Sequence, residues 1–243
     1  MPHLSIVIPA YNEEKRLPRT LERMIPHLRP LGFTFEILIV DDGSKDRTVA
    51  VVRDLAASNP EIRLISDGIN RGRGAAVKKG IFDSKGDLIL ETDSDGSVAD
   101  EAIGRFVQRF DENPAIDAIF GSREMKGAIV AVHQPLARIV LGYGFIYLTK
   151  VLFWMWSTTD FTLGFKMFRR AVAHDIFSYQ YDPFFVAEAE LTFIADVRGH
   201  HAIEMPVTWV NDDDSRVKPL RDVPRAFKGL AAILIRYFQG RYK

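Results

Sequence analysis

The chain of 243 residues contains no cysteine. This absence excludes disulfide bonds, thiolate zinc sites and a cysteine nucleophile. A bound metal ion would therefore need oxygen or imidazole ligands, and carboxylate ligands favour hard ions such as Mg²⁺ or Mn²⁺. The adjacent histidines His200 and His201 would point to opposite faces of a strand, so we expect structural or surface roles for them rather than a shared metal.

The chain also lacks net charge, because 32 Lys and Arg residues balance 32 Asp and Glu residues. We therefore expect no nucleic-acid partner, since a neutral chain exerts no long-range attraction on nucleic acid. No run reaches the roughly 18 to 20 apolar residues of a membrane-spanning helix; Lys150 interrupts the closest one, residues 139–156. Neither a basic flank nor a cleavage site precedes the first apolar segment, so we expect no signal peptide and a cytosolic active site.

Short apolar segments alternate with helical patterns through the first hundred residues. We expect strands at residues 4–9, 35–40, 62–66 and 87–91, and helices that end near residue 28 or span residues 48–58 and 72–84. This alternation predicts an α/β fold of the Rossmann-like kind, with a mostly parallel central sheet and helices on both faces. Ligands of such folds bind beyond the carboxyl ends of the strands, and polar clusters follow the strands there.

The second half of the chain is less regular. We expect strands at residues 116–121 and 202–209, helices at residues 135–156, 166–176, 186–198 and 223–242, and a polar loop at residues 211–220. We expect one domain over residues 1–210, with a first half at 1–125 and a second half at 126–210. A loop and a basic amphipathic helix follow at 211–243. The apolar segment near 130–156 is rich in Tyr and Trp, which suits an interfacial helix beside a membrane or a helix buried in the core.

The fourth predicted strand ends at Asp93-Ser94-Asp95-Gly96. Two carboxylates two residues apart at a strand end can present oxygens to one hard cation, which bridges the phosphates of a nucleotide donor. Asp93 and Asp95 are therefore the predicted metal ligands, with Ser97 as a third oxygen. A solvated turn is the alternative, because Asp and Gly are common in turns.

Two further polar clusters follow other strands. The carboxylates of Asp41-Asp42-Gly43-Ser44 can accept hydrogen bonds from a base or a ribose, although this segment can also cap the next helix. Asn70-Arg71-Gly72-Arg73-Gly74 offers backbone amides and guanidinium groups to a phosphate, or forms a tight turn. Its glycine spacing and its place in the chain match neither a dinucleotide-binding loop nor a P-loop.

Six segments occur together in one order: IVIPAYNEE, IVDDGSKDRT, INRGRGAAV, ETDSDGS, GSR and TTDFTLGFKMFRR. This order resembles family 2 glycosyltransferases with the GT-A fold, and within them the polyprenyl-phosphate (dolichyl-phosphate) mannose and glucose synthases, over residues 4 to about 210. The resemblance implies inverting transfer of a hexose, mannose or glucose, from GDP-mannose or UDP-glucose to a polyprenyl phosphate. It also implies a catalytic domain at residues 1–210, with a nucleotide-sugar-binding half (1–125) and an acceptor half (126–210), followed by an acceptor loop within 211–243. Gly96-Ser97-Val98 after the acidic motif is closer to the glucose synthase pattern.

The polar clusters and the resemblance together give a set of candidate site residues. The catalytic candidates are Asp93, Asp95, Asp160 and Arg123. The candidates for donor binding are Pro9, Ala10, Tyr11, Glu13, Asp41, Asp42, Asn70, Arg73, Gly74 and Ser94. The candidates for acceptor binding are Arg123, Arg138, Gly164, Lys166, Ser215, Arg216 and Lys218. The resemblance also places Glu188 and Glu190 on an acidic helix behind the acceptor side.

The acceptor determines what chemistry the protein must supply. A phosphate monoester is largely anionic at neutral pH, its second pKa being about 6, so it needs no strong base. Asp160 would then orient the acceptor, whereas it would act as a base toward a hydroxyl or cap the following turn.

The predicted C-terminal helix carries basic residues among apolar ones, which resembles a surface anchor. These residues are Arg225, Lys228, Arg236, Arg241 and Lys243. We therefore expect a peripheral enzyme at the cytoplasmic face of a membrane. The alternatives are a glycosyltransferase that acts on a hydroxyl of a soluble or glycan acceptor, and a non-catalytic nucleotide-sugar-binding module.

Overall fold

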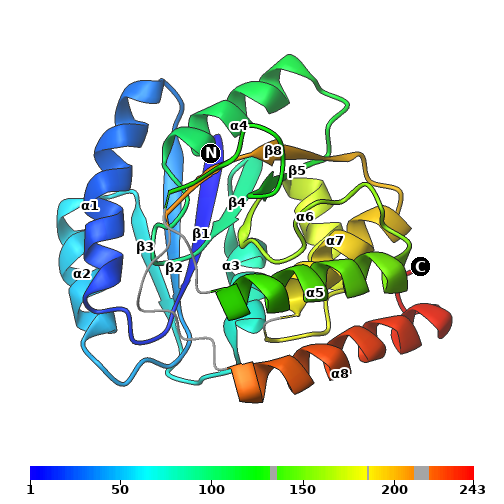
Figure 1. The fold of residues 1–243 in the computed structure, drawn as a ribbon. Coiled ribbons are helices and arrows are strands. Elements are labelled where there is room, and N and C mark those ends of the chain that lie inside the picture. Colours follow the sequence, from blue (N-terminus) through cyan, green and yellow to red (C-terminus); the bar gives the residue numbers. More distant parts are fainter. Residues whose placement is uncertain (132–135, 185, 211–218) are drawn as a thin grey trace.

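The computed structural model describes residues 1–131, 136–184, 186–210 and 219–243. A seven-stranded sheet of order β3-β2-β1-β4-β7-β5-β8 forms its centre, and helices cover both faces (Figure 1). The strands of this sheet are β1 (Leu4–Ala10), β2 (Phe35–Asp41), β3 (Ile62–Ser66), β4 (Leu88–Thr92), β5 (Ala118–Ser122), β7 (Phe165–Arg169) and β8 (Ala202–Pro206). The predicted α/β architecture is confirmed.

The first half of the chain forms the predicted βαβ units. Strand β1 pairs in parallel with β2 and β4, and β2 pairs in parallel with β3. The connecting helices are α1 (Arg16–Leu28), which continues into the short η1 (Arg29–Leu31), α2 (Thr48–Ser58) and α3 (Arg73–Asp83). Because Ala10, Asp41 and Ser66 lie side by side in the register, the segments after these strands meet at one edge of the sheet.

The predicted helix at residues 166–176 is wrong in its first part. Residues 165–169 form β7, which pairs antiparallel with both β4 and β5, and α6 (Arg170–Ser178) follows. Phe165 and Met167 pack into one hydrophobic core, while Phe168 packs into the other. A strand buried on both faces lacks the polar–apolar alternation that distinguishes strands from helices in a sequence.

Three other elements differ from the expectation. Helix α4 (Glu101–Glu112) was not predicted, although Ala102, Ile103, Phe106, Val107 and Phe110 bury one helical face. The predicted strand at residues 202–209 is divided into β8 and β9 (Thr208–Trp209), and β9 pairs with β6 (Ile129–Val130) in a separate two-stranded sheet. The C-terminal helix α8 (Pro219–Phe238) begins and ends four residues earlier than predicted.

The central sheet separates two hydrophobic cores, one under α1, α2 and α4 and the other under α3, α6 and α7 (Ala187–Val197). Helices α5 (Leu136–Phe153) and α8 lie side by side as an outer layer (Figure 1). Phe153 of α5 and Tyr237 of α8 both pack on Phe193 of α7, at ring distances of 4.4 and 5.3 Å. Within the described ranges, no helix is both long and apolar enough to span a bilayer.

Candidate active site

The acidic turn at residues 93–96 follows β4 directly, and helix α1 holds it in place. Thr20 Oγ1 donates to the carbonyl of Ser94 at 2.9 Å, and Arg23 Nη2 donates to the carbonyl of Gly96 at 2.9 Å. Gly96 has a φ of 63°, and a Cβ there would lie 2.9 Å from both α1 side chains. Only glycine fits this turn without strain, so α1 and Gly96 together fix the direction of the two carboxylates.

Asp93 points toward Arg73, the first residue of α3. Arg73 Nε donates to Asp93 Oδ1 at 2.8 Å, and Arg73 Nη1 donates to Glu188 on α7. Burial alone would lower the pKa of Arg73, but Asp93 and Glu188 more than offset it and raise this pKa. A Cβ at Gly164 would lie 2.1 Å from Arg73 Nη2 and 2.9 Å from Asp93 Oδ2. The glycine therefore lets the arginine reach the acidic turn.

A second cation lies behind Arg73. Lys166 of β7 is buried, and its ammonium donates to the carbonyl of Leu163 at 2.6 Å and to Glu188. The Glu188 carboxylate thus binds one cation on each oxygen. We refer to Arg73, Asp93, Lys166 and Glu188 as the buried charge cluster, in which Lys166 and Glu188 are buried while Arg73 and Asp93 remain partly exposed.

Glu91 borders this cluster, because it lies opposite Lys166 in the register of β4 and β7. Its side chain is fully buried, and neither carboxyl oxygen has a hydrogen-bond partner among the described residues. Burial, with a contribution from Glu188, raises the pKa of Glu91 to about 8. Burial therefore favours the protonated form of Glu91, and the carboxylates that bind the two cations of the cluster are those of Asp93 and Glu188.

The two acids after β2 hold neighbouring loops. Asp41 accepts hydrogen bonds from the backbone N–H of Ser44 at 3.0 Å and from Ser66 Oγ at 2.7 Å. Asp42 accepts from two backbone N–H groups of the 70–74 loop, at 2.7 and 3.0 Å, and burial raises its pKa. Asp42 therefore anchors the loop that carries Arg73.

The segment after β1 joins the same edge of the sheet. Glu13 is buried, and its carboxylate accepts from Arg16 Nε at 2.7 Å and Nη2 at 2.6 Å. Asn12 has a φ of 56° and bonds to the turn after β2, through its N–H to Ser44 Oγ at 2.9 Å and its Oδ1 to the N–H of Lys45 at 2.7 Å. The other predicted donor-binding residues of this segment are Pro9 and Ala10, which end β1, and Tyr11, which follows it.

A second charged pair follows β5. Arg123 donates to Asp160 through Nε at 2.7 Å and Nη2 at 3.0 Å, and Nη2 also donates to Thr162 Oγ1 at 2.6 Å. The guanidinium lies over the ring of Trp209, 5.4 Å from its centroid. Burial would raise the pKa of Asp160, but Arg123 lowers it to about 2. A carboxylate with so low a pKa is a poor proton acceptor.

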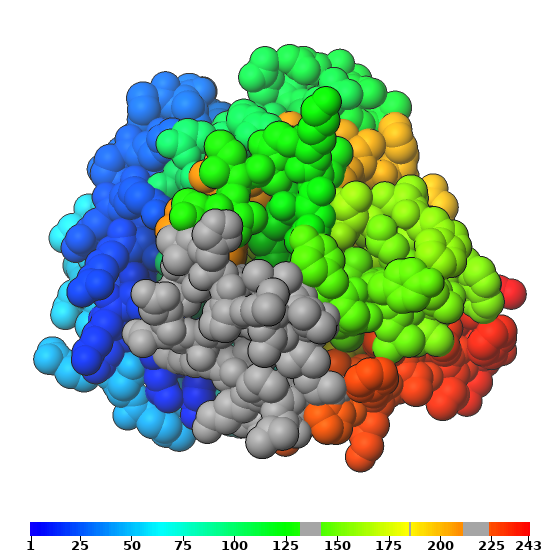
Figure 2. Space-filling model, in the orientation of Figure 1, coloured from blue at the N-terminus to red at the C-terminus, as the bar shows by residue number. Residues whose placement is uncertain are grey.

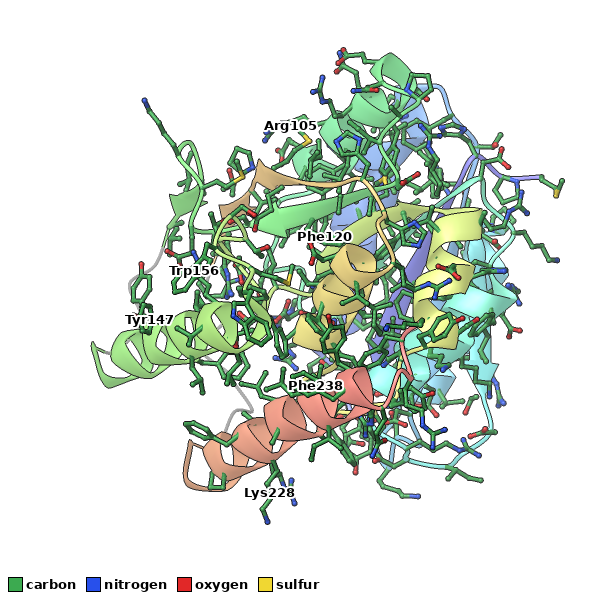
Figure 3. The ribbon with its side chains drawn as sticks, turned by 90° about the vertical axis from the view of Figure 1, so that its right-hand side faces the viewer. Arg105, Phe120, Tyr147, Trp156, Lys228 and Phe238 are labelled. Atoms are coloured by element: carbon green, nitrogen blue, oxygen red, sulfur yellow. The ribbon has the colours of Figure 1, made fainter. Side chains whose placement is uncertain are left out.

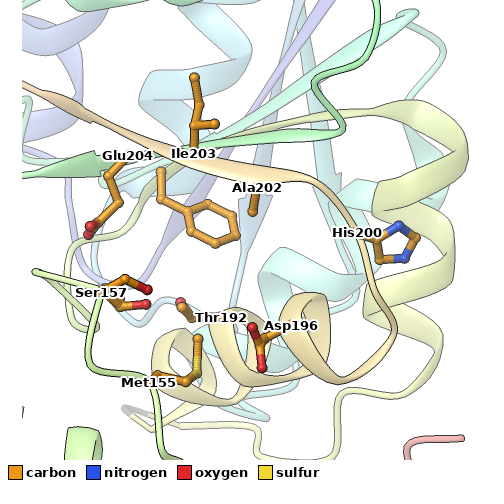
Figure 4. A pocket seen from close by; sticks show the side chains of 10 residues that line it. Met155, Ser157, Thr192, Asp196, His200, Ala202, Ile203 and Glu204 are labelled. Carbon is orange, nitrogen blue, oxygen red and sulfur yellow. The ribbon is translucent and has the colours of Figure 1, made fainter.

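Glu204 of β8 holds the loop that carries Asp160. Its carboxylate accepts from the backbone N–H of Thr159 at 2.8 Å and of Asp160 at 3.0 Å. A cavity of about 200 Å³ lies behind this loop, with Glu204 and Ser157 on one side and His200 further along (Figure 4). His200 Nε2 lies 2.7 Å from Asp175, in line with its predicted structural role.

Two residues predicted to bind the acceptor lie beside a residue predicted to bind the donor. Gly164 and Lys166 were predicted on the acceptor side, yet they contact Arg73 and Glu188. The N–H of Gly74 donates to the carbonyl of Pro183 at 2.9 Å, so it supports the loop. Ligand contacts of all these residues stay predictions. Ser215, Arg216, Lys218 and the side chain of Arg138 lie outside the described residues.

Sequence reasoning did not identify three residues that hold the site together: Glu91, Thr162 and Glu204. It gave Glu188 only through the resemblance. A glutamate inside an otherwise apolar strand or helix was the available signal, as in AIEMP around Glu204 and AEAELTFIA around Glu188. A buried charge needs a partner, but the sequence does not say which one.

The carboxylates predicted as ligands of a metal ion are those of Asp93 and Asp95. The N–H of Ser97 donates to Asp95 Oδ1 at 2.9 Å, so Ser97 positions this carboxylate. In the part of the chain that the structure describes, no three His, Asp or Glu side chains are grouped to bind a metal. One or two carboxylates suffice for Mg²⁺ when substrate phosphates and water complete the coordination. The residues present therefore fit a divalent cation that is bound together with a diphosphate.

Comparison with known proteins gives one family and a consistent set of relatives. The family model "Glycosyl transferase family 2" matches residues 5–177. A dolichyl-phosphate beta-glucosyltransferase of Trichomonas vaginalis, ALG5C, is 34% identical over 225 residues, which cover 89% of this chain and 66% of the relative. The dolichyl-phosphate beta-glucosyltransferase of Homo sapiens is 32% identical over 253 residues, which cover 99% of this chain and 77% of the relative.

Solved structures match at the level of the fold. Glucosyl-3-phosphoglycerate synthase from Mycobacterium tuberculosis, in complex with UDP, superposes with a TM-score of 0.70 at 16% identity, over 99% of this chain and 80% of that one. The mannosyltransferase PcManGT from Pyrobaculum calidifontis, in complex with GDP-Man and Mn²⁺, superposes with a TM-score of 0.65 at 18% identity, over 97% of this chain and 64% of that one.

Proposed function

Because this chain belongs to glycosyltransferase family 2, we propose that it transfers a hexose from a nucleotide sugar to a dolichyl (polyprenyl) phosphate. The family and the GT-A fold predicted from the sequence are confirmed. The relatives named dolichyl-phosphate beta-glucosyltransferase support this acceptor. The observation that carries the proposal is the Arg123–Asp160 pair, in which both carboxylate oxygens accept hydrogen bonds from the guanidinium.

The pair suits an acceptor that brings its own nucleophile. A phosphate monoester is already anionic at neutral pH, and it needs a cation more than a base. Asp160 and Thr162 hold the Arg123 guanidinium through Nε and Nη2. Nη1 is then the group that would donate a charge-assisted hydrogen bond to such a phosphate. A sugar hydroxyl would instead need a proton acceptor, and Asp160 is too weak a base for that role.

On the donor side, the buried charge cluster places Arg73 beside the acidic turn, where the diphosphate of the donor would bind. Attack in line with the departing diphosphate requires both substrates to be held in one orientation. Asp42 and Glu204 hold the two loops that would contact them through hydrogen bonds to backbone N–H groups. A Mg²⁺ or Mn²⁺ ion held by Asp93 and Asp95 would supply positive charge to the leaving group.

We propose glucose, donated by UDP-glucose, as the transferred sugar. The names of the relatives support glucose, and Gly96-Ser97-Val98 after the acidic motif fits the glucose synthase pattern. Inverted stereochemistry agrees with a beta-linked product. GDP-mannose is the other donor, and it is an outcome of the test below.

We also propose that α5 and α8 rest on a membrane surface. On and just after α5, Tyr143, Tyr147, Trp154 and Trp156 are each more than half exposed, and side chains of this kind gather at bilayer interfaces. Figure 3 shows Tyr147 and Trp156 on one outer edge of the molecule and Lys228 of α8 pointing away from the fold. Location at the cytoplasmic face stays a prediction.

A transfer assay tests the function. The purified chain is given UDP-glucose or GDP-mannose with a radiolabelled sugar, MnCl₂ and vesicles that contain dolichyl phosphate. We expect label in the lipid from UDP-glucose, loss of transfer with EDTA, and a rate at least roughly a hundredfold lower for Arg123→Ala. Arg105→Ala, an exposed arginine on α4 (Figure 3), is the matched control.

Label transferred only from GDP-mannose would correct the sugar. Label found only on a soluble glycan would contradict the proposed lipid phosphate acceptor. UDP binding without transfer to any acceptor would indicate a non-catalytic nucleotide-sugar-binding module.

A further inference from the structure

Helix α7 carries two buried carboxylates, and only Glu188 belongs to the site described above. The other, Glu190, is fully buried. Its Oε2 accepts from the backbone N–H groups of Tyr181 at 3.0 Å and Asp182 at 2.7 Å. Its Oε1 accepts from Tyr242 Oη at 2.6 Å and from Arg236 Nη1 at 3.2 Å. One oxygen thus holds the loop before α7, and the other holds the end of the C-terminal helix.

The loop at residues 181–184 is in direct contact with the 70–74 loop. The carbonyl of Pro183 accepts from the N–H of Gly74 at 2.9 Å. A Cβ at Gly74 would lie 2.8 Å from the carbonyl of Asp182 and from Ala187 Cβ. The backbone next to Arg73 therefore rests on the 181–184 loop, and a shift of that loop would displace the guanidinium.

The end of the chain is equally well fixed. Tyr242 is fully buried, with its ring 6.0 Å from Tyr181 and 6.1 Å from Phe193. The guanidinium of Arg236 lies over the ring of Tyr181, 5.1 Å from its centroid. The segment after α8 is therefore packed into the molecule, directly behind the loop that supports Arg73.

Both carboxylates lie in the first turn of α7, where the helix dipole stabilises negative charge. Residues two apart on a helix point to different sides. Glu188 accordingly faces Arg73 and Lys166, whereas Glu190 faces α8 and the 181–184 loop. One helical turn connects the C-terminal helix to the buried charge cluster.

We propose that Glu190 is a positioning residue for the donor site: it fastens the end of α8 to the 181–184 loop, and this loop sets the place of Arg73. The proposal rests on the proposed function in so far as Arg73 faces the donor diphosphate. It makes α8, whose outer face we place on the membrane, part of the framework of the donor site.

Titration calorimetry with UDP and MnCl₂ tests this role without any acceptor. In Glu190→Gln the side-chain nitrogen no longer accepts, so either the loop N–H groups or the donors from α8 lose a partner. We expect UDP to bind roughly tenfold more weakly. Tyr242→Phe removes one of the two bonds from the α8 side and leaves that of Arg236, so we expect a smaller loss of the same sign, about threefold. Tyr237→Phe, another hydroxyl at the same end of α8, is the control and should bind UDP like the unchanged chain.

Steady-state kinetics separates positioning from general damage. Glu190→Gln and Tyr242→Phe should raise KM for the nucleotide sugar while KM for dolichyl phosphate stays the same. A lower melting temperature with unchanged UDP affinity would overturn the proposal and leave a structural role alone. If Glu190→Gln does not fold, Tyr242→Phe decides by itself. Because UDP binding is measured directly, failure of the transfer reaction would not be confused with failure of this proposal.

Discussion

At the scale of single residues, the charge of Arg123 keeps Asp160 ionised although burial opposes this. The Asp160 side chain is 0% exposed, and its pKa falls from 3.8 to about 2. A carboxyl whose pKa is lower in the folded state adds stability above its unfolded pKa, and this stability is lost as the pH falls through the folded pKa. A shift of this size corresponds to about 2 kcal/mol.

We expect Asp160→Asn to lower the free energy of unfolding at pH 7 by about 3 kcal/mol, because Arg123 would stay buried without a counter-charge. The difference from the unchanged chain should shrink as the pH falls from 4 toward 2, where Asp160 itself becomes protonated. Urea unfolding across this pH range measures it. A difference that stays constant from pH 7 to pH 2.5 would contradict the assignment.

Gly164→Ala tests the close approach of Arg73 to the acidic turn. The new Cβ would lie 2.1 Å from Arg73 Nη2, so the guanidinium must leave Asp93. We expect KM for the nucleotide sugar to rise roughly tenfold or more, since a charge-assisted bond is lost. Gly144→Ala on α5, where a Cβ meets nothing within 4 Å, is the control. Equal kinetics for both variants would show that Arg73 does not need this space.

Residue-level chemistry could be predicted because the acids follow strand ends. Asp93, Asp41 and Asp42 lie at one edge of the sheet, as predicted, with β1 between Asp93 and the other two. The partners of the other buried carboxylates could not be predicted, since Glu188 of α7 binds Arg73, 115 residues earlier, and Glu204 of β8 holds the loop that carries Asp160. Only the assembled sheet decides which buried carboxylate meets which cation.

At the scale of elements, β7 shows the limit of sequence patterns. Its apolar run with one lysine reads as either a helix or a strand, and pairing with β4 and β5 decides between them. Helix α5 illustrates the opposite case, because its length and composition gave its position well. Helix α8 was predicted as amphipathic, and it does bury Ala226, Leu230 and Ile233 while exposing Arg225, Phe227 and Lys228.

The exposed aromatic residues that follow α5 provide an element-scale prediction. Trp154 and Trp156 are 65% and 57% exposed, so replacing both with alanine should change the melting temperature little. We expect the fraction of protein that sediments with phosphatidylcholine vesicles to fall several-fold, because interfacial tryptophans are lost. Phe82→Ala, an exposed aromatic on α3, is the control. Unchanged sedimentation of the double variant would mean that the segment after α5 does not contact the membrane.

At the scale of the whole molecule, a neutral net charge coexists with a basic helix beside an aromatic one. Figure 2 shows α8, coloured orange to red, along the lower edge of this face with the end of α5 above it. Anionic lipid attracts basic residues near the surface by about 1 kcal/mol each, and salt screens this attraction. For the proposed membrane contact, we therefore expect the local charge of α8 to matter more than the zero net charge of the chain.

Charge reversal at two positions tests this contribution. Arg225→Glu with Lys228→Glu should weaken binding to vesicles rich in phosphatidylserine at least roughly tenfold at low salt. Binding to phosphatidylcholine vesicles should change little, and UDP affinity should not change. Loss of UDP affinity in this variant would mean that α8 was displaced from the fold rather than from the lipid.

The sequence pattern predicted the class of the fold, a mostly parallel sheet with helices on both faces, because βαβ alternation allows few arrangements. The antiparallel strand in its middle could not be predicted, since β7 joins partners that lie far from it along the chain. The division into two halves near residue 125 stays a prediction, and strands from both sides of that point share one sheet.

The place of β7 has a consequence for biosynthesis. Strand β4 is translated early, but the partner on its free side is residues 165–169. A ribosome must therefore synthesise more than seventy further residues before this edge is covered. During that interval the nascent chain presents an unpaired apolar strand, the kind of edge that promotes association between chains. A fragment ending near residue 125 would keep this edge unpaired, so we expect it to require a chaperone where the chain of 243 residues does not.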